Sequence, residues 1–125
     1  MQPNDLRVVA IPDPGRQYLG QVTTRANSMT LVYSDYGSED GDIVDIMSNQ
    51  RTIASRVYLT KQSKSTTVSL NYGENVIAFR ALDQGKSGKN TAAFKIVDSN
   101  GKTLVSNKRW SLYTGNRAEI LVVKN

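Results

Sequence analysis

The amino-acid sequence predicts an all-β domain, an Ig-like or jelly-roll β-sandwich of about seven to eight strands with an extended N-terminal arm. Three observations indicate this fold. From residue 28 onward, apolar and polar residues alternate with a period of two in one short segment after another. Turns rich in Gly, Asn, Asp and Ser separate these segments. All three prolines precede them, at Pro3, Pro12 and Pro14, so no expected strand loses a ladder donor.

The strands are expected where the alternation is clear. Met29, Leu31 and Tyr33 define the first apolar face, and Trp110 is expected to anchor the core or its rim. The expected segments lie near residues 28–34, 43–47, 52–59, 66–70, 76–81, 92–96 and 118–123, with short apolar stretches between 102 and 112.

Residues 1–27 are predicted to form the arm, which leaves residues 28–125 as the sandwich domain. Each proline fixes its own φ angle and biases the preceding residue toward extended backbone. A short helix over Gln17 to Ala26 is an alternative, which Gly20 weakens. Apolar residues favour an arm that orders on another subunit over a floppy terminus; they are Leu6, Val8, Val9, Ile11, Tyr18, Leu19 and Val22.

The composition argues against an enzyme. The 125 residues include neither histidine nor cysteine, which excludes Ser-His and Cys-His nucleophile systems and the usual zinc ligand sets. A glycosidase would need two carboxylates facing each other across a cleft, whereas the acids here crowd into one stretch. The chain also lacks an apolar run of the length expected for a signal peptide or a membrane span.

The net charge of +5 is unevenly distributed. Residues 35–45 hold five acids and no base, whereas residues 48–124 hold thirteen Lys or Arg and four acids. Such a separation suits self-association or packing against a neighbour, and a merely solvated surface is an equally weighted alternative. The basic and aromatic residues at 108–110 and at Arg56 and Tyr58 are too sparse to favour a nucleic-acid partner.

The acidic stretch, DYGSEDGDIVD at residues 35–45, has two interpretations. An EF-hand loop that began at Asp35 would need glycine at its sixth position, which is Asp40. A calcium site of another kind remains open, with Asp35, Glu39, Asp40 and Asp42 as candidate ligands. The favoured interpretation is a turn in which Asp40-Gly41 reverses the chain and neighbouring carboxylates bind backbone N–H groups.

Three segments together resemble a recurring β-domain of structural proteins in tailed bacteriophages, especially cyanophage-like ones, with related modules in exported Bacteroidetes-type proteins. They are residues 35–46, 70–85 and 89–102. The matching motifs are Glu39-Asp40-Gly41-Asp42, Gly73, Asn75, Ala81-Leu82, Gly85 and Asn90-Thr91-Ala92. Asn49-Gln50 departs from the usual Asn-Gly, and Asp83 stands where Asn is commoner. The resemblance covers about residues 28–124.

The resemblance implies a non-catalytic virion module that is assembled in the host cytoplasm. Such a protein would decorate the head or belong to the neck, baseplate or fibre, with other virion proteins and copies of itself as partners. A homo-oligomer would fit this role. The alternative is a carbohydrate- or cell-surface-binding module, with a host-surface glycan as ligand and calcium as a stabilising ion. No catalytic residue and no cofactor other than that calcium are expected.

Overall fold

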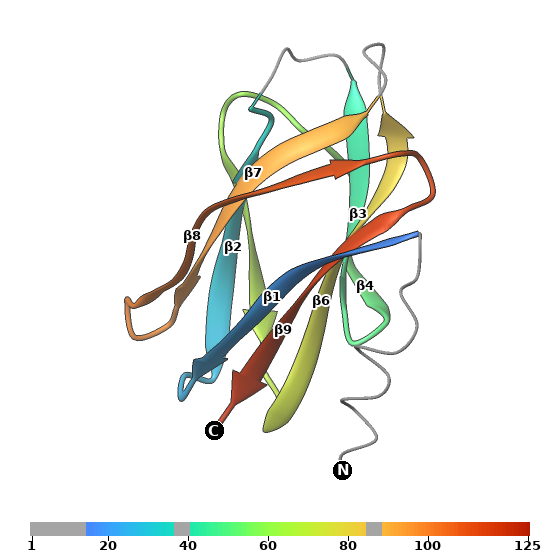
Figure 1. The fold of residues 1–125 in the computed structure, drawn as a ribbon. Coiled ribbons are helices and arrows are strands. Elements are labelled where there is room, and N and C mark those ends of the chain that lie inside the picture. The colour runs from blue at the N-terminus through green and yellow to red at the C-terminus, as the bar shows by residue number, and fades with distance from the viewer. Residues whose placement is uncertain (1–14, 37–40, 85–88) are drawn as a thin grey trace.

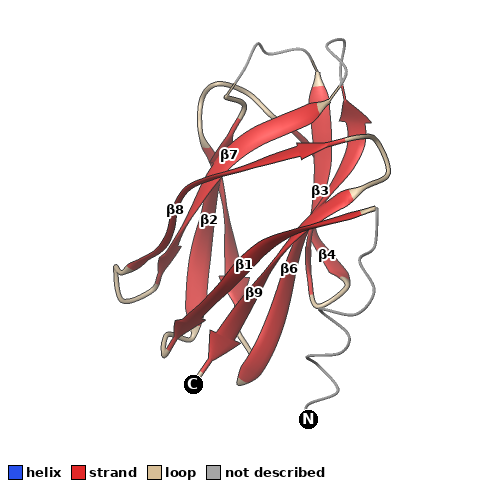
Figure 2. Cartoon of the chain, viewed as in Figure 1, coloured by secondary structure: helices blue, strands red, loops and turns tan. Residues whose placement is uncertain are grey.

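Nine β-strands in two facing sheets form the described part of the computed structural model, which covers residues 15–36, 41–84 and 89–125 (Figure 1). They are β1 (Arg16–Thr24), β2 (Ser28–Ser34), β3 (Asp42–Ser48), β4 (Arg51–Tyr58), β5 (Lys64–Ser69), β6 (Gly73–Gln84), β7 (Asn90–Asp98), β8 (Thr103–Leu112) and β9 (Arg117–Lys124). Within those residues no helix occurs (Figure 2). The predicted all-β sandwich is therefore confirmed.

The two sheets have the strand orders β1-β9-β6-β3-β4 and β5-β2-β7-β8. Only β3 with β4 and β7 with β8 are consecutive strands that pair in one sheet. Every other pair of consecutive strands is divided between the sheets, so the chain crosses the sandwich repeatedly (Figure 1). The core consequently joins residues that are far apart in sequence.

The core lies between the sheets, where the inward positions of the alternating strands meet. In β2 the predicted face Met29, Leu31 and Tyr33 is buried, and the same pattern recurs in β6, β7 and β9. Burial of these side chains supplies most of the driving force for folding. Trp110 is 1% exposed in the middle of this layer, which confirms its expected role.

The predicted arm is wrong over residues 16–24, because β1 is a strand of the sandwich. It runs parallel to β9 at the edge of the five-stranded sheet, and Leu19 is buried in the core. The pairing register shifts between Tyr18 and Gln21, around Gly20 with its φ of 119°. This bulge changes which face the following side chains point to, so the period of two is interrupted. The first fourteen residues of the predicted arm lie outside the described residues.

The β3–β4 hairpin explains how the chain tolerates a departure from the Asn-Gly turn. Asn49 and Gln50 both have positive φ angles, 53° and 70°, as a two-residue hairpin turn requires. Asn49 fits this position because its side chain accepts a hydrogen bond from the Val76 N–H at 2.8 Å. Gln50 has no such compensation among the hydrogen bonds of this turn, and a left-handed conformation is costly for a residue with a Cβ atom.

Gln50→Gly is therefore expected to stabilise the protein by about 0.5–1 kcal/mol, because glycine adopts a positive φ without steric cost. A urea unfolding midpoint would measure the change. Asn49→Gly is the matched control: it should destabilise the protein, since it removes the bond to Val76. A lower midpoint for Gln50→Gly would contradict this explanation of the turn.

Candidate functional site

Buried polar residues at the strand ends are the most informative side chains of the fold. Five of them continue the inward apolar series of their own strand by one further step of two residues. They are Asp35 after β2, Asp42 at the start of β3, Asn75 near the start of β6, Asn90 at the start of β7 and Asp98 at the end of β7. Buried polar groups must find hydrogen-bond partners, so these positions organise the two ends of the sandwich.

The described acids of residues 35–45 do not share one environment. Asp35 and Asp42 are buried, and Asp45 accepts a hydrogen bond from the Arg56 backbone N–H at 2.8 Å. Glu39 and Asp40 lie outside the described residues. Gly41 has a φ of 94°, as expected for the glycine of a turn, and the predicted binding of backbone N–H groups by neighbouring carboxylates is confirmed at Asp45. Of the described acids in this stretch, Asp42 and Asp45 thus bind backbone N–H groups within the fold, and Asp35 is buried.

Two motifs of the proposed resemblance meet in space. One carboxylate oxygen of Asp42 accepts a hydrogen bond from the backbone N–H of Thr91 at 3.0 Å. The side-chain amide of Asn90 donates to the carbonyl of Ile43 at 3.0 Å and to that of Asp83 at 2.8 Å. These bonds connect β3 and β6 of one sheet to β7 of the other. Residues almost fifty positions apart are thus held in one buried polar cluster.

Asn90 also binds the aromatic centre of the core. Its side-chain oxygen accepts a hydrogen bond from the indole N–H of Trp110 at 2.9 Å. The Trp110 ring stacks on Phe79 with 4.4 Å between centroids, and Phe94 lies 5.1 Å from Phe79. A buried indole N–H needs an acceptor, and Asn90 supplies one without a charge. We call Asp42, Asn90, Thr91 and Trp110 the polar anchor.

A second buried amide, Asn75, performs the equivalent task near the opposite end of β6. Its nitrogen donates to carbonyls of Asn71, Gly73 and Val122 at 2.9, 3.2 and 3.2 Å. Its oxygen accepts from the Asn71 N–H at 2.9 Å and from the Asn49 amide at 3.3 Å. One side chain thereby joins the β5–β6 turn to β9 and to the β3–β4 hairpin.

Among the residues that it describes, the structure does not bring the other candidate residues from the sequence together into a site. Trp110 is buried while Lys108 and Arg109 are exposed, so the basic and aromatic residues at 108–110 do not form one surface. Over residues 15–36, 41–84 and 89–125, no group of three or more Asp, Glu, His or Cys side chains is arranged to hold a metal ion. The calcium interpretation depends on Glu39 and Asp40 and therefore stays a prediction.

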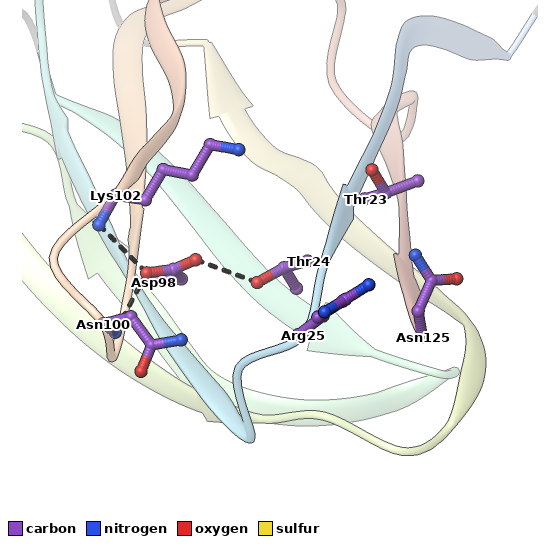
Figure 3. A pocket seen from close by; sticks show the side chains of 7 residues that line it. All are labelled: Thr23, Thr24, Arg25, Asp98, Asn100, Lys102 and Asn125. Carbon is purple, nitrogen blue, oxygen red and sulfur yellow. Dashed lines mark hydrogen bonds between the residues drawn. The ribbon is translucent and has the colours of Figure 1, made fainter.

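A shallow pocket of about 290 Å³ lies at the end of the sandwich formed by the β7–β8 turn and the end of β1 (Figure 3). Its lining consists of Thr23, Thr24, Arg25, Asp98, Asn100, Lys102 and Asn125. Asp98 accepts hydrogen bonds from the N–H groups of Asn100 and Lys102 and from the Thr24 hydroxyl, at 2.9 to 3.0 Å. This carboxylate therefore shapes the turn and fastens β1 to it.

The same contacts lower the pKa of Asp98, first through the hydrogen bond from the Lys102 backbone and then through those from Thr24 and Asn100, against the opposing effect of burial. A carboxylate with a lowered pKa in the folded state contributes stability above its unfolded pKa of about 4. That contribution is lost as the pH falls from there through the folded pKa.

Asp98→Asn is accordingly expected to lower stability at pH 7 and to flatten the decline in stability below about pH 4. Thermal melting between pH 7 and pH 2 measures both effects. Thr24→Val removes the hydroxyl that donates to Asp98 and accepts from the Ala26 N–H. It should reduce the pH dependence less than Asp98→Asn, because the two backbone donors to Asp98 remain. An unchanged pH dependence in Asp98→Asn would show that this carboxylate does not contribute as described.

No family model, curated protein or solved structure matches this chain. Among the described residues, no helix is long and apolar enough to cross a membrane. Over the described residues, the chain is a β-sandwich of nine strands. The motif residues Asp42, Asn75 and Asn90 form hydrogen bonds within this fold. The sequence had indicated these residues through the resemblance, and it did not indicate their mutual contacts.

Proposed function

We propose that this chain is a non-catalytic structural protein of a tailed-phage virion, assembled in the host cytoplasm as a head-decoration, neck, baseplate or fibre component. The resemblance of residues 35–46, 70–85 and 89–102 supports the virion setting. The observation that carries an assembly role is the position of β1 at the edge of the five-stranded sheet. β1, the first strand of the described chain, therefore lies at the perimeter of the domain.

The N-terminal segment supplies the means of assembly in this proposal. Residues 1–14 contain the apolar residues Leu6, Val8, Val9 and Ile11. A short apolar segment that precedes an edge strand suits docking onto a neighbouring subunit, by strand addition or by burial of apolar side chains. Other virion proteins and further copies of this chain are the expected partners.

The charge of the described surface indicates the sign of charge expected on a partner. Folding exposes twelve cations there: Arg16, Arg25, Arg51, Arg56, Lys61, Lys64, Arg80, Lys89, Lys95, Lys102, Lys108 and Arg109. Glu74 and Asp83 are the only exposed acids among the same described residues. Three acids of residues 35–45 are not available for the predicted contact between an acidic and a basic surface. Asp35 and Asp42 are buried, and Asp45 binds the backbone N–H of Arg56. The partner of the cationic surface should itself be acidic.

The test compares the full chain with residues 15–125 by sedimentation velocity and by incorporation into phage particles. The shortened chain should remain folded, because it retains all nine strands, and should no longer assemble. A full-length variant with Leu6, Val8, Val9 and Ile11 replaced by serine is the matched control for length and should behave like the shortened chain. Normal assembly by both variants would refute the arm mechanism, and absence of the chain from purified particles would refute the virion setting.

A second candidate is a carbohydrate- or cell-surface-binding module stabilised by calcium. Five exposed tyrosines favour it: Tyr18, Tyr36, Tyr58, Tyr72 and Tyr113. Calcium would be detected as a rise in melting temperature on adding calcium chloride that chelation reverses. Such a rise, lost in Asp42→Asn and kept in Glu74→Gln, would favour this candidate and the predicted ligands Asp35, Glu39, Asp40 and Asp42 over the turn interpretation.

A further inference from the structure

Two exposed tyrosines, each with a cation over its ring, lie beside the outer side of the β5-β2-β7-β8 sheet. The Arg109 guanidinium is 4.6 Å from the centroid of Tyr36, and the Lys89 ammonium is 5.0 Å from that of Tyr113. Tyr36 is 42% and Tyr113 57% exposed. We define the tyrosine face as Tyr36, Lys89, Thr91, Arg109, Ser111 and Tyr113.

The strand register places these residues together. Thr91 pairs with Ser111, and the flanking rungs pair Asn90 with Leu112 and Ala92 with Trp110. The residues of the flanking rungs are all buried, so Thr91 and Ser111 point outward between them. Lys89 and Tyr113 continue the outward series from Thr91 and Ser111 by one step each. The start of β7 and the end of β8 lie at the same end of the sandwich (Figure 1).

Among the described residues, the exposed charges on this side of the sandwich are all positive. Asp98 is the only acid in the described strands β2, β5, β7 and β8, and it is buried. Asp35, which precedes Tyr36, is buried as well. Lys89, Lys95 and Arg109 are exposed. A ligand that complements this face must therefore carry negative charge.

The neutral side chains of the same sheet side indicate the kind of anion. Small hydroxyl residues outnumber the cations on its outward positions: Thr30, Ser34, Ser65, Thr67, Thr91 and Ser111. A nucleic acid has a phosphate on every nucleotide, and its binding depends mainly on clustered Lys and Arg contacts. An acidic polysaccharide has more hydroxyl groups than charges, and the amphipathic faces of its rings can pack on tyrosine. This composition matches the outward side of the sheet around the tyrosine face better; the tyrosine face itself holds two cations and two small hydroxyl side chains.

We propose that the tyrosine face binds a carboxylated polysaccharide chain. Arg109 and Lys89 pair with carboxylates, Tyr36 and Tyr113 pack against sugar rings, and Ser111 and Thr91 exchange hydrogen bonds with hydroxyl groups between them. The cation–π contacts hold each cation beside its ring, which limits the side-chain entropy lost on binding. This ligand class rests on the second candidate function, the carbohydrate-binding module, and names its ligand; it does not depend on residues 1–14 or on the assembly role.

Polygalacturonate is the probe, in affinity electrophoresis and calorimetry at low and at physiological ionic strength. The full chain should bind it, should bind less at higher salt, and should not bind neutral dextran. The double variant Tyr36→Ala/Arg109→Gln should weaken binding by about tenfold or more. The matched control is Tyr72→Ala/Arg51→Gln, and it should bind like the wild type. It changes an exposed arginine elsewhere and a tyrosine that is 79% exposed and has the Lys124 ammonium 4.1 Å from its ring centroid.

Two results would overturn the proposal. One is an absence of polygalacturonate binding, or an equal loss in the control double variant, which would reduce the interaction to net charge. The other is tighter binding of oligothymidylate than of polygalacturonate with the same dependence on Tyr36 and Arg109, which would assign the face to single-stranded nucleic acid. Unchanged circular dichroism and melting of both double variants would establish that their folding is intact.

Discussion

Replacing Asn90 with alanine is expected to lower the free energy of unfolding by about 3–5 kcal/mol, because the substitution leaves several buried polar groups without a partner. The indole N–H of Trp110 and the carbonyls of Ile43 and Asp83 all bond to this side chain at 2.8 to 3.0 Å. Asn90 itself is fully buried, so water cannot readily replace it. A loss of this size is a large part of the stability of a small domain.

Urea unfolding followed by the fluorescence of Trp110, the single tryptophan, measures this loss. Asn100→Ala is the matched control, since Asn100 is exposed in the β7–β8 turn, and it should change stability by less than about 0.5 kcal/mol. Trp110→Phe lacks the fluorescent probe and is followed by circular dichroism instead. It should cost less than Asn90→Ala in hydrogen bonding, because it leaves only the Asn90 oxygen without its partner. An Asn90→Ala variant about as stable as Asn100→Ala would contradict the described cluster.

Asn75→Ala is expected to cost about 3–4 kcal/mol, for the same reason at the other end of the sandwich. The variant frees carbonyls of Asn71, Gly73 and Val122 and the backbone N–H of Asn71. The β5–β6 turn is exposed at Tyr72, so water can satisfy some of these groups, and the expected loss is slightly smaller than for Asn90→Ala. The same urea titration measures it.

The two losses should also be additive. Asn75 and the Asn90 contact at Asp83 are eight residues apart on β6, which corresponds to about 26 Å along a strand. Substitutions at that separation with no shared partner usually act independently. The double variant is therefore expected to be unfolded or close to it in the absence of a stabilising osmolyte. Strong non-additivity in the residual stability would show that the two ends are coupled through the core.

The alternation of apolar residues predicted the sandwich because each inward face is continuous over several steps, as in Met29, Leu31 and Tyr33. It did not predict β1, because the bulge at Gly20 shifts the inward series from Leu19 to Val22 and Thr24. The parallel pairing of β1 with β9 joins the two ends of the domain. A contact of that sequence separation leaves no local pattern.

The polar anchor was only partly predictable. Asp42 and Asn90 stand two residues before inward apolar residues, Val44 and Ala92, so the period of two already places them inside. The prediction that the acids of residues 35–45 form a surface charge did not take into account that the period of two places Asp42 inside. The hydrogen-bond partners of these side chains could not be predicted. Asp42 in β3 of one sheet binds Thr91 in β7 of the other, and the sequence does not specify how the two sheets face each other. The tyrosine face likewise depends on strand neighbours that the sequence does not specify.

Hydrogen exchange at the indole N–H of Trp110 tests the central claim, that the motif residues form a buried polar anchor between the sheets, most directly. One tryptophan gives one indole resonance, so the measurement is unambiguous. Because this N–H donates to a buried Asn90, we expect it to exchange only through global unfolding, with an exchange free energy equal to the stability from urea titration. Exchange at the rate of an exposed indole in the folded wild-type protein would contradict the polar anchor.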